Sequence, residues 1–264
     1  MRKIKFITIL IIMGLIVTGS LSVFAEKNNE LDGRAIMKRV YERDTGEDRQ
    51  SDLKMILVNR HEDERVREIR QFEKDFGEVE KKIMFFLSPK DVRNTSFMNW
   101  SYEDKTEDDQ WLYLPAVRKI KRISGENKND QFMGSDFTYD DMGERELDED
   151  THTLLREEEY RGQDCYVVES VPVEDDYMYS KTITWVDKKD WIGLKKEFYD
   201  PEGELLKTLK NQEYREVEGI LTVFKSEMHN VQDDHRTIIE LDNVDYNVGL
   251  SEDKFTERMM RRGL

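Results

Sequence analysis

The sequence contains few of the residues that build disulfide frameworks or redox sites. It has one cysteine in 264 residues. A single cysteine cannot form an internal disulfide, so the stability of the fold must come from its core. Asp164 precedes Cys165 in a segment that resembles a strand, and a neighbouring carboxylate disfavours the thiolate that a nucleophilic cysteine requires. We therefore interpret Cys165 as a small buried hydrophobic residue.

Motifs for catalysis and for metal or cofactor binding are also missing. The segment His61-Glu-Asp-Glu-Arg65 resembles the zinc-protease pattern His-Glu-x-x-His, but Arg65 occupies the place of the second ligand. His229 and His235 flank a predicted turn, and no third ligand accompanies them. No nucleophile elbow, phosphate loop or dinucleotide fingerprint occurs. We expect no catalytic residue, no metal ligand and no cofactor, and an enzyme is the least favoured class of function.

Positive charge is scarce in comparison with negative charge. The chain has 42 lysines and arginines against 58 acidic residues, and its formal net charge is −16. Such a surface repels nucleic acid, so we expect no nucleic-acid partner. Acidic runs such as 144–150 and 157–159 are expected by chance in so acidic a chain and lack the spacing of a calcium loop. We interpret them as solvated surfaces.

The N-terminus has the three parts of a secretory signal. Three basic residues among the first five precede an apolar run over 6–17, and Val23 and Ala25 occupy the positions that signal peptidase reads. The run is shorter than the roughly twenty residues that span a bilayer. These features predict a cleaved signal peptide over 1–25 and a periplasmic or otherwise extracytoplasmic mature protein, with a retained membrane anchor as the alternative. No cysteine lies near the expected cleavage site, so the residue that carries the lipid in bacterial lipoproteins is missing there.

The mature chain is predicted to be mainly β. Asp32 resembles the N-cap of a short amphipathic helix over 34–41. From Ser51 to Val244 the apolar pattern has a period of two, and turn signals recur every eight to twelve residues. This pattern indicates about eleven strands in one antiparallel sheet. No linker rich in proline, glycine or serine interrupts residues 26–264, so we expect a single domain.

One long segment, 124–150, interrupts the strand pattern. Loops of this length are uncommon in compact domains and are usually functional or disordered. This one carries three aromatic residues and two methionines, and disordered segments are poor in aromatic residues. We expect it to pack back onto the sheet as a lid.

Several central strands carry apolar residues on both faces, as in Ile83–Leu87. The excess apolar surface could line a cavity or form ordinary core, and the sequence leaves both possibilities open. Successive side chains alternate between faces, so only some of the candidates can line a cavity. We favour Trp111 and Tyr113, which share a face. The full set of candidate cavity residues is Trp111, Tyr113, Trp100, Phe85, Phe86, Phe97 and Met98.

One stretch carries a specific family resemblance. The segment Trp111–Ile123, followed by Met133–Met142, resembles the outer-membrane lipoprotein-sorting protein family of LolA-like carriers. Asp32–Tyr41, Ile83–Pro89 and Gly162–Tyr166 resemble other parts of the same family, in the same order. The motif loop of this resemblance comprises Gly134, Ser135, Asp136, Phe137, Thr138, Tyr139 and Asp141.

The resemblance implies a half-open barrel, in which a curved antiparallel sheet and a helical lid enclose a hydrophobic cavity. It implies a soluble carrier that binds acyl chains of lipoproteins or other lipids in transit towards the outer membrane, without catalytic residues. An inner-membrane exporter is an implied partner, and we expect a monomer. The alternative is an envelope interaction module that docks on an exporter or membrane protein without carrying lipid.

Overall fold

The structure, a computed structural model, describes residues 31–103 and 107–264. The expected signal peptide over 1–25 lies outside the described residues. Thirteen strands form one antiparallel sheet in the order β6-β5-β4-β3-β2-β1-β13-β12-β11-β10-β9-β8-β7. Their bounds are β1 (Asp48–Val58), β2 (Glu64–Asp75), β3 (Val79–Ser88), β4 (Ser96–Tyr102), β5 (Asp109–Leu114), β6 (Lys119–Ile123), β7 (Asp150–Tyr160), β8 (Gln163–Pro172), β9 (Lys181–Asp187), β10 (Gly193–Tyr199), β11 (Leu205–Val217), β12 (Ile220–Asn230) and β13 (His235–Tyr246).

The sequence analysis predicted the single antiparallel sheet correctly, but its count of about eleven strands was too low. Short strands explain the difference, because they offer little periodicity. Strand β6, for example, has five residues, of which three are basic. Every neighbouring pair in the sheet is consecutive along the chain except β1 and β13, which pair around Leu53 and Leu241.

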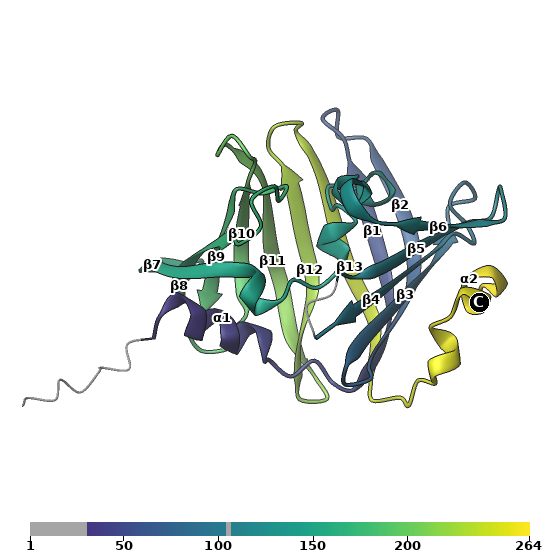
Figure 1. Cartoon of the computed structure of the whole chain (residues 1–264), viewed down its shortest axis with the longest axis horizontal. Coiled ribbons are helices and arrows are strands. Elements are labelled where there is room, and N and C mark those ends of the chain that lie inside the picture. Colours follow the sequence, from purple (N-terminus) through teal and green to yellow (C-terminus); the bar gives the residue numbers. More distant parts are fainter. Residues whose placement is uncertain (1–30, 104–106) are drawn as a thin grey trace, which may run out of the picture. The chain divides into compact units, whose positions relative to one another are not determined.

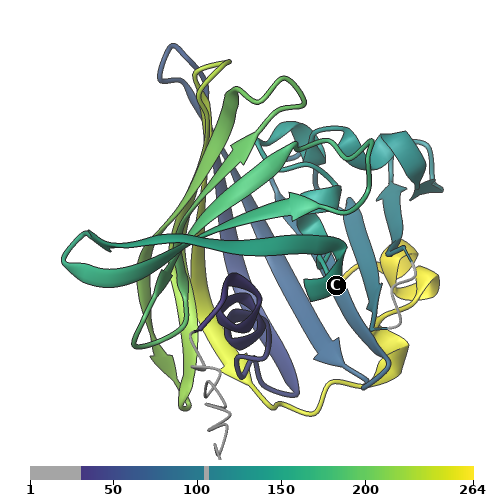
Figure 2. The ribbon, with the colours of Figure 1, turned by 60° about the vertical axis from the view of Figure 1, so that its left-hand side comes forward.

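The sheet curls around the helix α1 (Gly33–Tyr41), which lies inside the curve (Figures 1 and 2). The Asp32 side chain caps this helix, accepting a hydrogen bond from the Ala35 amide at 2.7 Å. Ile36 is fully buried against Val168 of β8 and Val186 of β9. The short N-terminal helix expected from the sequence therefore holds the β7–β9 end of the sheet.

Residues 124–149, here called the cover segment, contain four turns of 3₁₀-helix. They are η1 (Gly125–Asn129), η2 (Phe132–Gly134), η3 (Asp140–Met142) and η4 (Leu147–Glu149). Phe132 is fully buried, and its ring centroid lies 5.0 Å from that of Phe97 on β4. The cover segment thus packs on the inner face of the sheet, as the sequence predicted.

The C-terminal segment covers the opposite face of the same strands. It comprises η5 (Glu252–Lys254) and α2 (Glu257–Arg262), shown in yellow in Figure 1. Phe255 and Met260 are fully buried there among side chains of β2–β5. Two covers therefore account for the strands that are apolar on both faces. Among the described residues, no helix combines the length and hydropathy needed to cross a membrane.

Candidate functional site

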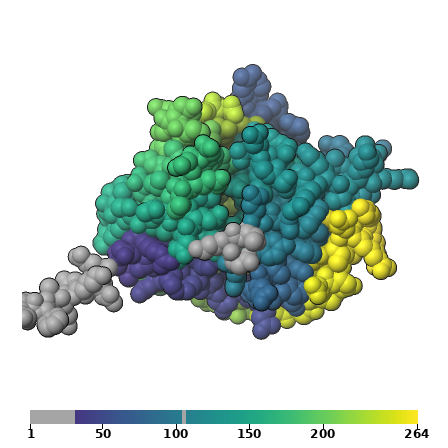
Figure 3. All heavy atoms as spheres, in the orientation of Figure 1, coloured from purple at the N-terminus to yellow at the C-terminus, as the bar shows by residue number. Residues whose placement is uncertain are grey.

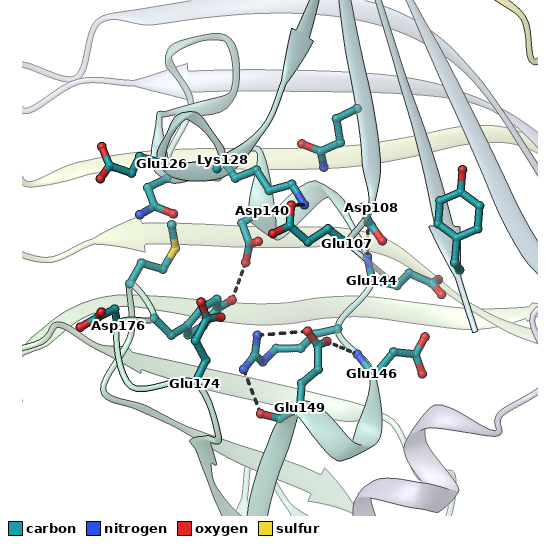
Figure 4. A pocket seen from close by; sticks show the side chains of 17 residues that line it. Glu107, Asp108, Glu126, Lys128, Asp140, Glu144, Glu146, Glu149, Glu174 and Asp176 are labelled. Carbon is teal, nitrogen blue, oxygen red and sulfur yellow. Dashed lines mark hydrogen bonds and ion pairs between the residues drawn. The ribbon is translucent and has the colours of Figure 1, made fainter. Parts of the chain in front are cut away.

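Two pockets lie beside the cover segment, inside the curve of the sheet. The first, here called the acidic pocket, has a volume of about 340 Å³ and is drawn in Figure 4. The second, here called the mixed pocket, has a volume of about 300 Å³. The two pockets share Asp140, Arg145 and Tyr177, so they adjoin. Figure 3 shows the face of the molecule on which α1 and the cover segment lie, with a narrow hollow near its centre.

Carboxylates dominate the acidic pocket. Lys128 and Arg145 are its two basic residues. Burial raises the pKa of Asp140 and of Glu149, and repulsion from neighbouring carboxylates acts in the same direction. The acidic residues that line the pocket are Glu107, Asp108, Glu126, Asp140, Glu144, Glu146, Glu149, Glu174 and Asp176.

The mixed pocket combines apolar and charged walls. Its apolar wall comes from Phe137 of the cover segment and from Phe198, Leu209 and Met228 of strands β10, β11 and β12. Its polar residues come from the cover segment, from the 173–180 loop and from β7–β10. They are Asp140, Asp141, Arg145, Asp150, Ser170, Tyr177, Tyr179, Thr182 and Lys196. Such a combination suits an amphiphilic ligand rather than a purely apolar or purely ionic one.

Two aspartates of the motif loop fasten the cover segment to the sheet. Asp141 accepts a hydrogen bond from the ammonium of Lys207 on β11 at 2.6 Å. Asp136 accepts one from the hydroxyl of Thr237 at 2.6 Å and contacts His235 at 2.9 Å, both on β13. Lys207 and Asp136 are 3% and 5% exposed, so these charge-assisted bonds are shielded from water and screening. This anchoring is the clearest structural role of the motif loop.

A second charged group lies between strands β1–β3 and the cover segment. Glu73 pairs with Arg49 and, at 3.4 Å, with Lys82, and these cations hold the pKa of Glu73 below its ordinary value. Burial and the neighbouring Glu144 raise the pKa of Glu80 to about 8. Glu144 belongs to the cover segment and also lines the acidic pocket. The protonation of Glu80 is therefore linked to the position of the cover.

The candidate cavity residues of the sequence analysis lie outside both pockets. Phe86 and Phe97 are buried beneath the cover segment. The other five lie on the opposite face, in one cluster with the C-terminal segment, namely Phe85, Met98, Trp100, Trp111 and Tyr113. A role of these seven residues in lipid contact stays a prediction.

The motif loop is divided between the mixed pocket and its supports. Phe137 and Asp141 line the mixed pocket, and Gly134 lines a smaller one beside His235. Tyr139 packs on Phe97 and Phe132. The remaining members make hydrogen bonds inside the loop or to its surroundings, namely Ser135, Asp136 and Thr138.

Sequence reasoning did not select Lys196, Tyr177, Tyr179 or Phe198 as site residues, although all four line the mixed pocket. Alternation along β10 could have indicated that Lys196 and Phe198 share a face. No pattern in the sequence shows which face of β10 points inward, because Lys195 and Lys196 are adjacent.

The fold and much of the sequence are similar to proteins of known structure. A domain assigned to the outer membrane lipoprotein-sorting proteins, from Vibrio parahaemolyticus, is 35% identical and has a TM-score of 0.83 over 87% of this chain and 98% of its own. A DUF1329 family protein from Desulfovibrio piger is 32% identical, with a TM-score of 0.82 over 86% and 97%. A LolA superfamily protein from Nitrosomonas europaea is similar in fold, with 18% identity and a TM-score of 0.67 over 86% and 99%.

A protein-family model described as an uncharacterized protein matches residues 78–262. No curated protein matches the chain. The matched range contains every residue that lines the acidic pocket and the mixed pocket.

Proposed function

Because the chain belongs to the outer-membrane lipoprotein-sorting protein family and has its LolA-like fold, we propose that it is an extracytoplasmic carrier of acyl chains. Its cargo is a lipidated protein or a lipid, received from the inner membrane, with an exporter as the donor. Residues 1–25 direct its export and are removed, and the mature chain acts as a monomer.

The apolar wall of the mixed pocket is the observation that supports this proposal. Phe198, Leu209 and Met228 lie side by side on strands β10–β12, inside the curve of the sheet and next to open space. Burying one methylene is favourable by about 0.8 kcal/mol, so exposing a long acyl chain to water costs on the order of 10 kcal/mol. An apolar trough offsets this free-energy cost without catalytic groups. This agrees with the missing catalytic motifs.

The cover segment has a firm part and a loose part, which suits loading and release. Phe132 and Tyr139 anchor the firm part in the core. The turns η3 and η4, over 140–149, bury no residue. At about 300 Å³ the mixed pocket is at the lower limit of ligand pockets. We propose that residues 143–149, which follow the anchored Asp141, move aside when an acyl chain enters.

Leu209→Trp tests the position of the acyl chain. The larger side chain fills the mixed pocket from its partly exposed wall, so uptake of a fluorescent fatty-acyl probe should weaken about tenfold or more. Leu155→Trp is the matched control, because Leu155 on β7 is 41% exposed and should accept the same change without effect. Equal binding of the probe by both variants would show that the acyl chain does not occupy this pocket.

Native mass spectrometry of protein purified from its host tests the carrier function itself. A carrier should retain lipid, and the wild-type protein should bind the fluorescent probe. A wild-type protein that neither retains lipid nor binds the probe would favour the envelope interaction module instead.

A further inference from the structure

The acidic side chains of the mixed pocket all have hydrogen-bond donors. Asp141 accepts from Lys207 at 2.6 Å and from the Tyr179 hydroxyl at 3.0 Å. Asp150 accepts from Arg145 at 2.8 Å. Asp140 accepts from the hydroxyl of Tyr177, which also lines the pocket. These carboxylates are therefore satisfied by the protein and need no ligand.

Lys196 is the exception among the charged residues of this pocket. Within residues 31–103 and 107–264, no carboxylate lies within ion-pair distance of its ammonium. The ring of Phe198, on the same face of β10, is 5.1 Å away. Burial lowers the pKa of Lys196 even though Asp150 and Asp141 act in the opposite direction, whereas the ion-paired Lys82 has a raised pKa. A cation in such surroundings is costly unless an anion compensates it.

Unpaired hydroxyls lie beside this lysine on the neighbouring strand. Thr184 of β9 is the direct cross-strand partner of Lys196, and Thr182 is the partner of Phe198. Both threonines are more than nine-tenths buried, and neither hydroxyl has a hydrogen-bond partner in the described part of the chain. Thr182 also lines the mixed pocket. An ammonium and a free hydroxyl at one end of an apolar wall form a site for an anion.

We propose that Lys196, with Thr182, binds the anionic head group of the lipid whose acyl chain lies on Phe198, Leu209 and Met228. This inference rests on the proposed carrier function and specifies its ligand as an acidic amphiphile, with a carboxylate or phosphate head. The nine carboxylates of the acidic pocket repel the same head group, so the ligand has one favourable orientation. Its charge lies at Lys196 and its chain extends along β11 and β12.

Lys196→Met removes the charge and keeps most of the length of the side chain. Lys195→Met is the matched control, because Lys195 lies on the opposite face of β10, over the Trp185 ring at 4.1 Å and paired with Glu197 at 2.6 Å. Two probes are compared, a fluorescent fatty acid and its methyl ester. They share the acyl chain and differ in the charge of the head.

The wild-type protein should bind the acid at least about tenfold more tightly than the ester, as expected for a charge-assisted contact. Lys196→Met should lose this preference and bind both probes with the affinity of the ester, whereas Lys195→Met should keep it. The melting temperature of Lys196→Met should equal or exceed that of the wild type, because a charge without an ion pair is removed from the pocket.

Four results would overturn the inference. If Lys196→Met keeps the preference for the acid, or if the wild type binds acid and ester equally, Lys196 is no head-group site, while the carrier function stands. If the wild type binds neither probe, the carrier function fails as well. Inorganic phosphate should not displace the acid probe, and displacement by phosphate would assign the site to free anions instead of lipid.

Discussion

The two ends of the sheet are built from the same kind of strand but are filled differently. At the β2–β6 end, the cover segment and the C-terminal segment enclose both faces, and Phe97 and Phe132 are completely buried. At the β8–β12 end, polar side chains share the inner face with Phe198 and Met228, and open space remains. The comparison indicates that one end stabilises the fold, whereas the other end is free to bind a ligand.

Tyr113→Asp should unfold the β2–β6 end of the sheet, which is enclosed on both faces. Tyr113 is 9% exposed and packs in the cluster beneath the C-terminal segment. An uncompensated charge there costs about 3–5 kcal/mol, in addition to the lost packing, so thermal denaturation should show an unfolded or strongly destabilised protein. An unchanged melting temperature with lost uptake of the fatty-acyl probe would instead show that Tyr113 lines a binding cavity, as the sequence analysis favoured.

A pair of identical truncations compares the two ends directly. Phe97→Ala should lower the free energy of unfolding by about 3–5 kcal/mol, because it leaves a cavity in a closed core. Phe198→Ala should cost less, roughly 1–3 kcal/mol, because its ring already faces the open mixed pocket. Urea denaturation measures both values. Equal losses would contradict the distinction between a structural end and a binding end.

The smallest effect concerns pH and the cover segment. The pKa of Glu80 rises from 4.5 to about 8 in the folded protein, so the folded state holds this proton more tightly than the unfolded state. The stabilising contribution is therefore complete below about pH 4.5 and is lost as the pH rises to about 8. The melting temperature should fall across this range in the wild type.

Glu80→Gln should reduce this fall, because the glutamine remains neutral at every pH. Glu78→Gln is the matched control, two residues earlier and exposed to solvent, and should retain the slope of the wild type. If the two variants show the same dependence on pH, Glu80 does not couple protonation to stability.

The sequence predicted the sheet and the first helix, because these depend on local periodicity. The aromatic residues of the cover segment predicted that it packs on the sheet. It could not predict which faces are covered. The C-terminal residues 251–262 are mostly polar, and only contacts far apart in the sequence show that Phe255 and Met260 fill the second face. Trp111 and Tyr113 therefore lie under the C-terminal segment, which no local sequence pattern predicts as a cover.

The mixed pocket was beyond sequence reasoning for a similar reason. Lys196 differs from Lys195 only in the face of β10 that it occupies, and the register with β9 and β11 decides this. The motif loop was selected by resemblance. Its buried links from Asp136 to Thr237 and from Asp141 to Lys207 become visible only in three dimensions.

The pairing of β1 with β13 has a consequence for folding. Strands β1–β6 and β7–β13 each join only neighbours along the chain, so each half can form from hairpins with low contact order. The seam around Leu53 and Leu241 joins residues almost two hundred positions apart, and it cannot close until the last strand is available. We expect a chain that is synthesised from its N-terminus to complete its sheet only after β13 has been synthesised.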